Sequence, residues 1–146
     1  MALIQNKKAY FNYEILEKIE AGIELLGFEV KSLKKGQGSL EGAHITIRGS
    51  EAFIIAMNIP PYQVNNTPTD YDPLRNRKLL LTKKELKNLE KEENQKGLTI
   101  VPLLVYNKGS KIKLEIAIVR GKKKYDKRET IKKRDTDREI NRSLKN

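Results

Sequence analysis

The sequence predicts a mainly β protein in which short strands form a small closed barrel, with helices at its flanks and a basic tail after it. Three observations predict this class. Apolar residues alternate with polar residues in several segments, turn-forming residues separate these segments, and the last part of the chain has very few apolar side chains. Alternation with a period of two is typical of half-buried strands, and a segment with few apolar residues cannot form a core.

The composition limits the possible functions. A length of 146 residues fits one domain, and the absence of cysteine excludes disulfides, thiolate metal sites and a cysteine nucleophile. The net charge of +11 indicates a polyanionic partner, because Lys and Arg side chains near phosphates release condensed counterions. The first ten residues lack the apolar run of a signal peptide or a membrane span, so we expect a cytoplasmic protein with no membrane partner.

The longest pattern covers residues 10–33. Odd-numbered positions in the range 11–25 are apolar except for position 17, which predicts one long strand. A helical period also aligns several of these apolar residues, but Gly22 would then lie inside a helix at a cost of about 1 kcal/mol relative to alanine. We therefore predict a strand that bends at Gly22 and Gly27, followed by one or two helical turns that end at Gly36.

The next segments predict a hairpin and a long connection. Residues 44–48 and 51–59 are expected to pair across a Gly-Ser turn, and a Pro-Pro pair ends the second strand. Residues 61–78 have no sustained periodicity, and long connections of this kind are usually functional or mobile. His44 is the single histidine of the chain. It is interpreted as a surface or packing residue, because general-base catalysis requires an orienting partner.

A helix is predicted after residue 82. Thr82 and Glu85 match a capping box, Leu86 and Leu89 form a narrow apolar stripe, and Gly97 is a candidate C-cap. The other positions of this helix are mostly Lys and Glu, so we expect it to pack on the barrel by one edge.

The last hairpin joins residues 98–106 to residues 111–121. Pro102 cannot donate a hydrogen bond to a ladder, so its strand is expected at a sheet edge or bulged there. Five or so strands connected in this way favour an oligonucleotide-binding-type (OB-fold-like) barrel over residues 1–121, with two or three helices and with residues 1–8 as a loose arm.

Residues 122–146 form the basic tail. From Arg120 to the end there are 12 basic and 5 acidic residues, and apolar side chains are too few to bury, so the tail is expected to be disordered when free. Wound as a helix, the tail would align Arg134 and Arg138 on one stripe that suits a phosphate-lined channel. The ring of Tyr125 lies among cations. From the residues alone, stacking on a nucleobase and capping the end of the barrel core are equally supported.

Three segments resemble the signature segments of the small protein B (SmpB) family, the bacterial SsrA-binding proteins. They are EAGIELLGFEVKSLKKG at 20–36, RNRKLLLTKKE at 75–85 and GKKKYDKRE at 121–129. The resemblance implies an OB-type barrel that binds the tRNA-like domain of transfer-messenger RNA (tmRNA, SsrA RNA). It also implies delivery of alanyl-tmRNA, with elongation factor Tu and GTP, to ribosomes stalled on messages without a stop codon, for trans-translation. No catalysis, cofactor or metal is implied.

The resemblance also assigns site residues. Its tmRNA-binding positions correspond to Asn6, Lys7, Glu20, Lys31, Arg75, Arg77, Lys78 and Leu80. Its ribosome-binding positions correspond to Lys122, Lys123, Lys124, Tyr125, Asp126, Lys127 and Arg128, to which the arginine stripe adds Arg134 and Arg138. In the family the tail is helical in the decoding centre and the empty mRNA channel. Other members can carry histidine at the position of Tyr125, which favours stacking on a decoding-centre base.

Glu20 is an acidic residue on a surface expected to face RNA. A carboxylate there would be repelled by phosphate, but it can accept hydrogen bonds from base or ribose donors, or hold a neighbouring cation in place. The alternative is a salt bridge to Lys31 or Arg77 without any role in RNA binding.

Two other classes of function remain open. A ribosomal or ribosome-assembly protein that binds rRNA through a basic extension would explain the composition equally well. An enzyme such as a nuclease is disfavoured, because the only histidine is isolated and no paired carboxylates occur in a matching segment. Asp70 and Asp72 come nearest, but their proline-flanked loop is typical of a turn.

Overall fold

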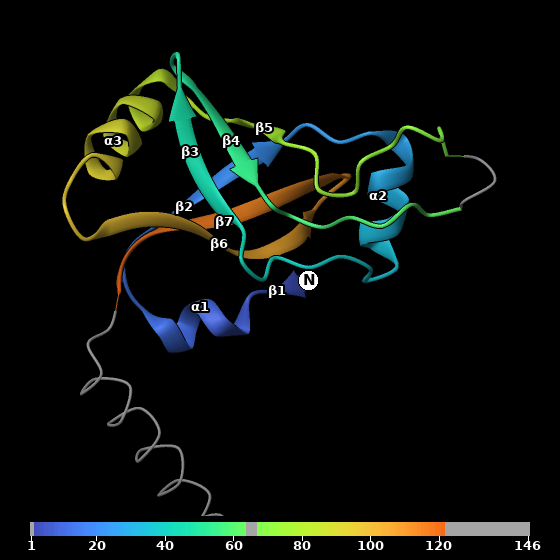
Figure 1. The fold of residues 1–146 in the computed structure, drawn as a ribbon, viewed down its shortest axis with the longest axis horizontal. Coiled ribbons are helices and arrows are strands. Elements are labelled where there is room, and N and C mark those ends of the chain that lie inside the picture. Colours follow the sequence, from blue (N-terminus) through green and yellow to red (C-terminus); the bar gives the residue numbers. More distant parts are fainter. Residues whose placement is uncertain (1, 64–66, 122–146) are drawn as a thin grey trace, which may run out of the picture.

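Within residues 2–63 and 67–121, the part of the chain that the computed structural model describes, seven antiparallel strands form one curved sheet flanked by three helices (Figure 1). The strands are β1 (Ala2–Gln5), β2 (Tyr13–Ile23), β3 (His44–Arg48), β4 (Glu51–Ile55), β5 (Arg77–Leu80), β6 (Leu98–Lys108) and β7 (Lys111–Gly121). The helices are α1 (Lys7–Asn12), α2 (Gly27–Lys34) and α3 (Lys83–Glu93). The predicted mainly β class with flanking helices is confirmed.

The sheet is open, so the prediction of a closed barrel is wrong. The strand order is β1-β6-β7-β2-β5-β4-β3, and no ladder between described residues joins the outer strands β1 and β3. The sheet instead curves until β3 packs against β6. At the outer edge of β3, the backbone N–H of Ile47 donates to Oε2 of Glu93, the last residue of α3, at 3.1 Å. Alternation in the sequence predicts strands but does not determine whether the first and last of them pair.

The N-terminal residues are ordered by a capping interaction. Oδ1 of Asn6 accepts a hydrogen bond from the backbone N–H of Ala9 at 3.3 Å and so caps α1, while Nδ2 of Asn6 donates to the carbonyl oxygen of Pro102 at 2.9 Å. Over residues 2–8, the described part of the predicted loose arm, the prediction is therefore wrong: β1 pairs with β6, and helix α1 follows it. The long strand begins only at Tyr13, because the cap favours a helix over continued alternation.

Strand β2 has an irregularity that the sequence did not predict. Its register with β7 shifts between Ile15 and Glu17, and Leu16, the residue at the shift, is 42% exposed. Gly22 allows β2 and β5 to pack closely and does not form a bulge. A Cβ atom at this position would lie 3.1 Å from Cβ of Leu80 on β5. The predicted helical turns after Gly27 are confirmed as α2.

The remaining elements agree closely with the predicted pattern. The β3–β4 hairpin turns at Gly49 and Ser50, both with positive φ, although β4 ends at Ile55 rather than at residue 59. The capping box of α3 is confirmed, but its C-cap is Asn94. The register of β6 shifts just after Pro102, which confirms the bulge, and β6 lies inside the sheet between β1 and β7.

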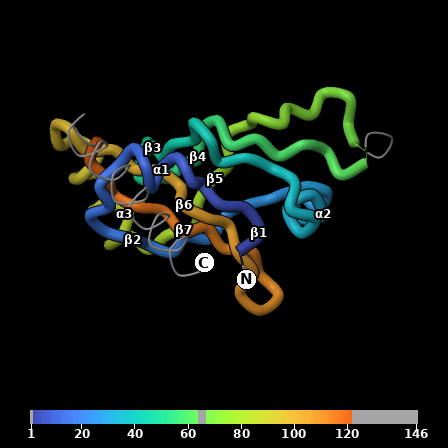
Figure 2. Tube along the Cα trace, turned by 90° about the horizontal axis from the view of Figure 1, so that it is seen from below, coloured from blue at the N-terminus to red at the C-terminus, as the bar shows by residue number. Residues whose placement is uncertain are grey.

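Apolar side chains are buried on both faces of the β6–β7 hairpin. The main core combines one face of the sheet with Leu33 of α2 and Leu89 of α3. A smaller cluster lies on the other face beneath α1 and contains Ala9, Val101, Leu103, Ala117 and Val119. The connection between β4 and β5 runs beside α2 in both views of the chain (Figure 1, Figure 2). None of the helices in the described segments has the length and hydropathy needed to cross a membrane.

Candidate nucleic-acid interface

The structure describes all eight predicted tmRNA-binding positions and separates them into groups. Glu20 lies on β2, Lys31 on α2, Arg75 just before β5, and Arg77, Lys78 and Leu80 on β5 itself. Asn6 and Lys7 lie at the start of α1, which Figure 1 shows far from the start of β5. The predicted ribosome-binding positions, from Lys122 to Arg138, lie outside the described residues.

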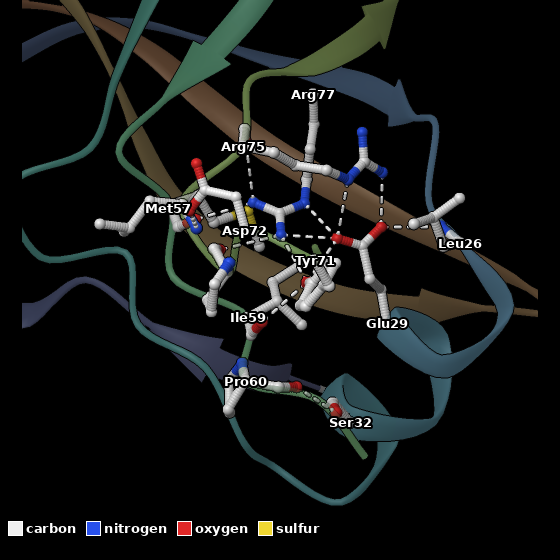
Figure 3. Close-up of polar contacts among 12 residues, drawn as sticks. Leu26, Glu29, Ser32, Met57, Ile59, Pro60, Tyr71, Asp72, Arg75 and Arg77 are labelled. Carbon is white, nitrogen blue, oxygen red and sulfur yellow. Dashed lines mark hydrogen bonds and ion pairs between the residues drawn. The ribbon is translucent and has the colours of Figure 1, made fainter. Parts of the chain in front are cut away.

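A buried carboxylate organises the region around β5. The side chain of Glu29, the third residue of α2, has no exposed surface. Its Oε1 accepts hydrogen bonds from the backbone N–H of Leu26 at 2.7 Å and from Nη2 of Arg75 at 2.6 Å. Its Oε2 accepts from Nε of Arg75 at 3.1 Å, from Nε of Arg77 at 2.8 Å and from the hydroxyl of Tyr71 at 2.8 Å. Figure 3 shows both guanidinium groups converging on this carboxylate.

Arg77 is also fully buried. Besides Glu29, its guanidinium donates to three backbone carbonyl oxygens and to the hydroxyl of Tyr71. The acceptors are Met57 O at 2.7 Å, Arg75 O at 3.1 Å, Pro73 O at 3.0 Å and Tyr71 Oη at 3.0 Å. These contacts tie the connection between β4 and β5 to the first residue of β5.

Tyr71 links the charged groups to the apolar side of α2. Its ring packs edge-on against Phe28, with centroids 4.7 Å apart. Its hydroxyl lies 2.8 Å from both Glu29 Oε2 and the carbonyl oxygen of Ile59, so it can donate its proton to either acceptor. We call Glu29, Tyr71, Arg75 and Arg77 the carboxylate–arginine network.

The network perturbs the ionisation of its members. Burial alone would raise the pKa of Glu29, but the hydrogen bonds from Arg75, Leu26, Arg77 and Tyr71 outweigh it and lower this pKa from 4.5 to about 2. Burial and the bond to Glu29 raise the pKa of Tyr71 to about 12. The network at neutral pH therefore holds one carboxylate, two guanidinium groups and a neutral phenol, which leaves one uncompensated positive charge.

No pattern in the sequence marks Glu29 or Tyr71 as functional residues. Glu29 lies within the first segment that resembles the family, and Tyr71 lies in the long connection before β5. A glutamate in the first turn of a predicted helix is ordinary, since it interacts favourably with the helix dipole. Its burial depends on arginines 46 and 48 positions later, which no local pattern reveals.

Glu20 lies in a second polar cluster on the exposed face of the sheet. Its carboxylate accepts hydrogen bonds from the hydroxyl of Tyr106 and from Nζ of Lys108, the latter at 3.0 Å. The bond from Tyr106 and then that from Lys108 lower the pKa of Glu20, and Lys113 adds a smaller attraction. Burial and the contact with Glu20 raise the pKa of Tyr106. The suggested ion pairs of Glu20 with Lys31 or Arg77 are therefore wrong.

A groove lies between the end of β5, the start of α2 and the β6–β7 turn. Its volume is about 340 Å³. Its lining is mostly apolar, but Lys111 and Lys113 line it at the start of β7. The lining residues are Gly22, Ile23, Leu25, Val30, Leu80, Ser110, Lys111, Ile112 and Lys113. Leu80 is 51% exposed and presents apolar surface to this groove. An apolar surface next to lysine side chains can bind a nucleobase by packing against it while the lysines bind the adjacent phosphate.

The other predicted positions have local partners. Nζ of Lys31 lies 5.9 Å from the ring centroid of Tyr62, and Nζ of Lys78 lies 3.4 Å from Oε1 of Glu51. Asn6 is buried, and its amide is occupied by the contacts that cap α1 and join it to β6. Lys7 is exposed. The structure thus gives Asn6 a structural role and leaves Lys7 accessible.

Comparisons with known proteins agree on one family. The model of the family described as SmpB protein matches residues 3–146. The SsrA-binding protein of Elusimicrobium minutum is 50% identical over 141 residues, which cover 97% of this chain and 89% of that protein. The SsrA-binding protein of Mesoplasma florum is 54% identical over 140 residues, which cover 96% and 94% of the two chains.

A solved structure shares the fold. It is described as "tmRNA-SmpB: a journey to the center of the bacterial ribosome", and its similar chain superposes with a TM-score of 0.69 at 42% identity. The match covers 83% of this chain and 85% of that chain.

Proposed function

This chain belongs to the SmpB family, and from that premise we propose that it binds tmRNA and delivers its tRNA-like domain to stalled ribosomes in trans-translation. The observation that carries the proposal is the family match over residues 3–146, almost the whole chain. A ribosomal protein that binds rRNA is not favoured, because the matching relatives are named for binding SsrA RNA.

The surface of the folded body supports RNA binding. Lys111 and Lys113 line part of an otherwise mostly apolar groove. Lys31 directly follows Val30, which also lines the groove, and Arg75 binds Glu29, the residue before Val30. Such a mixture supplies stacking surface for bases and charge for phosphates. We propose that residues 1–121 contact tmRNA through this face, with Lys7 adding a contact from α1.

We propose that residues 122–146 act separately on the ribosome. In this proposal the basic tail becomes helical in the decoding centre and the empty mRNA channel, where its arginines contact rRNA phosphates and Tyr125 stacks on a base. The protein then acts as an adaptor in the cytoplasm rather than as an enzyme, and meets elongation factor Tu with GTP only through alanyl-tmRNA.

A truncation tests this division. The full chain and a chain ending at Tyr125 are compared for affinity to a transcript of the tRNA-like domain of tmRNA, over a series of salt concentrations. We expect both to bind with a steep salt dependence, because binding neutralises phosphates. Only the full chain should support peptide tagging in a reconstituted translation system programmed with a message that lacks a stop codon.

The controls separate the alternatives. A scrambled RNA of the same length should bind weakly and measures non-specific affinity. Loss of affinity for the tRNA-like transcript in the truncated chain would contradict separate roles for body and tail. Stable co-sedimentation with non-stalled subunits after a high-salt wash would favour the rRNA-binding alternative.

A further inference from the structure

Arg75 and Arg77 share the carboxylate of Glu29, but their environments differ in a way that assigns them different roles. We infer that Arg75 binds a phosphate of the bound RNA, and that Glu29, Tyr71 and Arg77 are positioning residues that hold its guanidinium ready for that contact. The inference rests on the proposed function and concerns how one part of the RNA-binding face is organised.

Arg77 has no hydrogen-bonding capacity left for a ligand. A guanidinium has five N–H donors. Nε of Arg77 donates to Glu29, Nη1 donates to two carbonyl oxygens, and Nη2 donates to a carbonyl oxygen and to the hydroxyl of Tyr71. Its side chain also has no exposed surface. A direct contact with RNA would therefore require Arg77 to leave its buried site and to break all of these bonds.

Arg75 has spare donors and an accessible surface. Its Nε and Nη2 bind the two oxygens of Glu29 side-on, and Nη1 makes one long contact of 3.5 Å with the carbonyl oxygen of Asn76. Among the described residues, these contacts occupy three of its five donors and leave one N–H on each terminal nitrogen. The side chain is 31% exposed. Two neighbouring N–H groups on one guanidinium match the paired oxygens of a phosphate.

The network fixes Arg75 before any ligand arrives. A free arginine loses rotamer freedom when it binds, and a guanidinium already held by a carboxylate loses less. The carboxylate itself is fixed from the backbone of Leu26 and from the buried guanidinium of Arg77. The network holds two guanidinium groups and one carboxylate, so it keeps one net positive charge. Arg75 can therefore still attract an anion.

The connection that bears Arg75 is anchored by the same elements. The hydroxyl of Ser32 on α2 donates to the carbonyl oxygen of Pro60 at 2.6 Å, and the backbone N–H of Ile59 donates to the carbonyl oxygen of Pro73 at 3.0 Å. Tyr71 then closes the connection onto Phe28. The hydroxyl of Tyr71 also donates to Oε2 of Glu29, the oxygen that Nε of Arg75 binds. Removing only this hydroxyl should therefore loosen the carboxylate that holds Arg75 while leaving the ring contact in place.

A double-mutant cycle on RNA affinity tests the inference. The variants are Arg75→Lys, Tyr71→Phe and the double variant, assayed with the tRNA-like transcript at a temperature where circular dichroism shows each to be folded. Arg75→Lys keeps the charge but loses the paired donors, so we expect about tenfold weaker binding. Tyr71→Phe should weaken binding about threefold in the wild-type background and have almost no effect beside Arg75→Lys.

Matched variants control for the chemistry of each substitution. Arg48→Lys on β3 and Tyr13→Phe on β2 change the same groups outside the network, and both should bind as the wild type does. An equal effect of Tyr71→Phe in both backgrounds would show that Tyr71 acts without Arg75 and would overturn the inference. Wild-type affinity of Arg75→Lys would also overturn it.

A second measurement needs no substitution. Side-chain NMR signals of arginine N–H groups are followed while the transcript is added to the isotopically labelled full chain. The signals of Arg75 should shift and those of Arg77 should not; the reverse pattern would overturn the inference. Failure of the wild-type chain to bind the transcript at all would instead refute the proposed function.

Discussion

Arg77 and Glu29 meet inside the fold, 48 positions apart in the chain, with Nε of Arg77 2.8 Å from Oε2 of Glu29 and neither side chain exposed. Their contact joins α2 to the first residue of β5. A buried ion pair contributes little net stability compared with apolar residues of similar size, but removal of one partner is costly because the other charge remains buried. This asymmetry determines the first two predictions.

Replacement of Glu29 by Gln should strongly destabilise the protein. The substitution preserves the shape of the side chain but leaves two guanidinium groups without a counter-charge, so we expect a loss of about 3–5 kcal/mol in the free energy of unfolding. Urea denaturation measures it. The control is Glu41→Gln, because Glu41 pairs with Lys8 at 2.6 Å on the surface and should contribute less than about 1 kcal/mol. Similar losses in both variants would contradict the buried network.

The stability that Glu29 contributes should disappear in acid. Its pKa is lowered from 4.5 to about 2 in the folded protein, so its contribution is complete above about pH 4.5 and is lost as pH falls from there toward 2. The difference in unfolding free energy between the wild type and Glu29→Gln should therefore shrink by about 2 kcal/mol between pH 6 and pH 3. A difference that stays constant over this range would mean that Glu29 is not held ionised.

Asn6 and Lys7 should have separable effects. Asn6→Ala removes the cap of α1 and the bond to Pro102, so we expect about 1–2 kcal/mol of lost stability and little change in RNA affinity of the folded protein. Lys7→Ala should change the free energy of unfolding by less than about 0.5 kcal/mol. It should reduce the slope of log affinity against log salt concentration by about 1, the effect of losing one phosphate contact. Denaturation and salt-dependent binding of both variants provide the check, and an Asn6→Ala protein with normal stability but weak binding would refute the capping role.

Gly22→Ala should disturb Leu80 and, through it, the groove. The added Cβ would lie 3.1 Å from Cβ of Leu80, so the leucine must move, and we expect about 1 kcal/mol of destabilisation with weaker binding to the transcript. Gly27→Ala is the matched control, because a Cβ there meets nothing within 4 Å and a helix favours alanine. If both variants bind alike, Leu80 does not need its present position.

Glu20→Gln should separate two roles of this carboxylate. If Glu20 only neutralised Lys108, its loss would free a cation and strengthen RNA binding. We expect weaker binding instead, because a carboxylate facing base or ribose donors would accept their hydrogen bonds more strongly than an amide would. The carboxylate of Glu20 also holds Lys108 and Tyr106 in place. Both the RNA affinity and the midpoint of thermal unfolding are measured. The midpoint should not change, because Glu20 is exposed. Glu115→Gln on the neighbouring strand is the control variant.

The parts of the fold that depend on local chemistry could be predicted. The capping box at Thr82 and Glu85 and the helix after Gly27 each follow from a few adjacent residues, and the structure contains both. Pro102 predicts either an edge strand or a bulge, and the structure has the bulge. The predicted start of β2 was wrong, and the reason for this error is also local. Alternation continues back to Phe11, but Asn6 caps a helix that includes it.

The parts that depend on distant residues could not be predicted. Closure of the sheet depends on whether β1 and β3 meet, and nothing in either strand determines this. Arg77 lies in a stretch of basic residues typical of an RNA-binding surface, and only its meeting with Glu29 places it in the interior. Residues of this kind are exposed unless paired, so the reasonable expectation from sequence is a surface position.

The contact between Glu93 and the backbone of Ile47 has a consequence for behaviour at high concentration. A sheet that does not close offers its last strand to any other chain that could extend it, and this is how many β proteins begin to aggregate. Here Glu93 accepts the hydrogen bond of the Ile47 amide, so an added strand would have to displace this carboxylate in order to pair there. One amide of this outer strand is thus already paired within the molecule, and a neighbouring chain would meet a negative charge at that point.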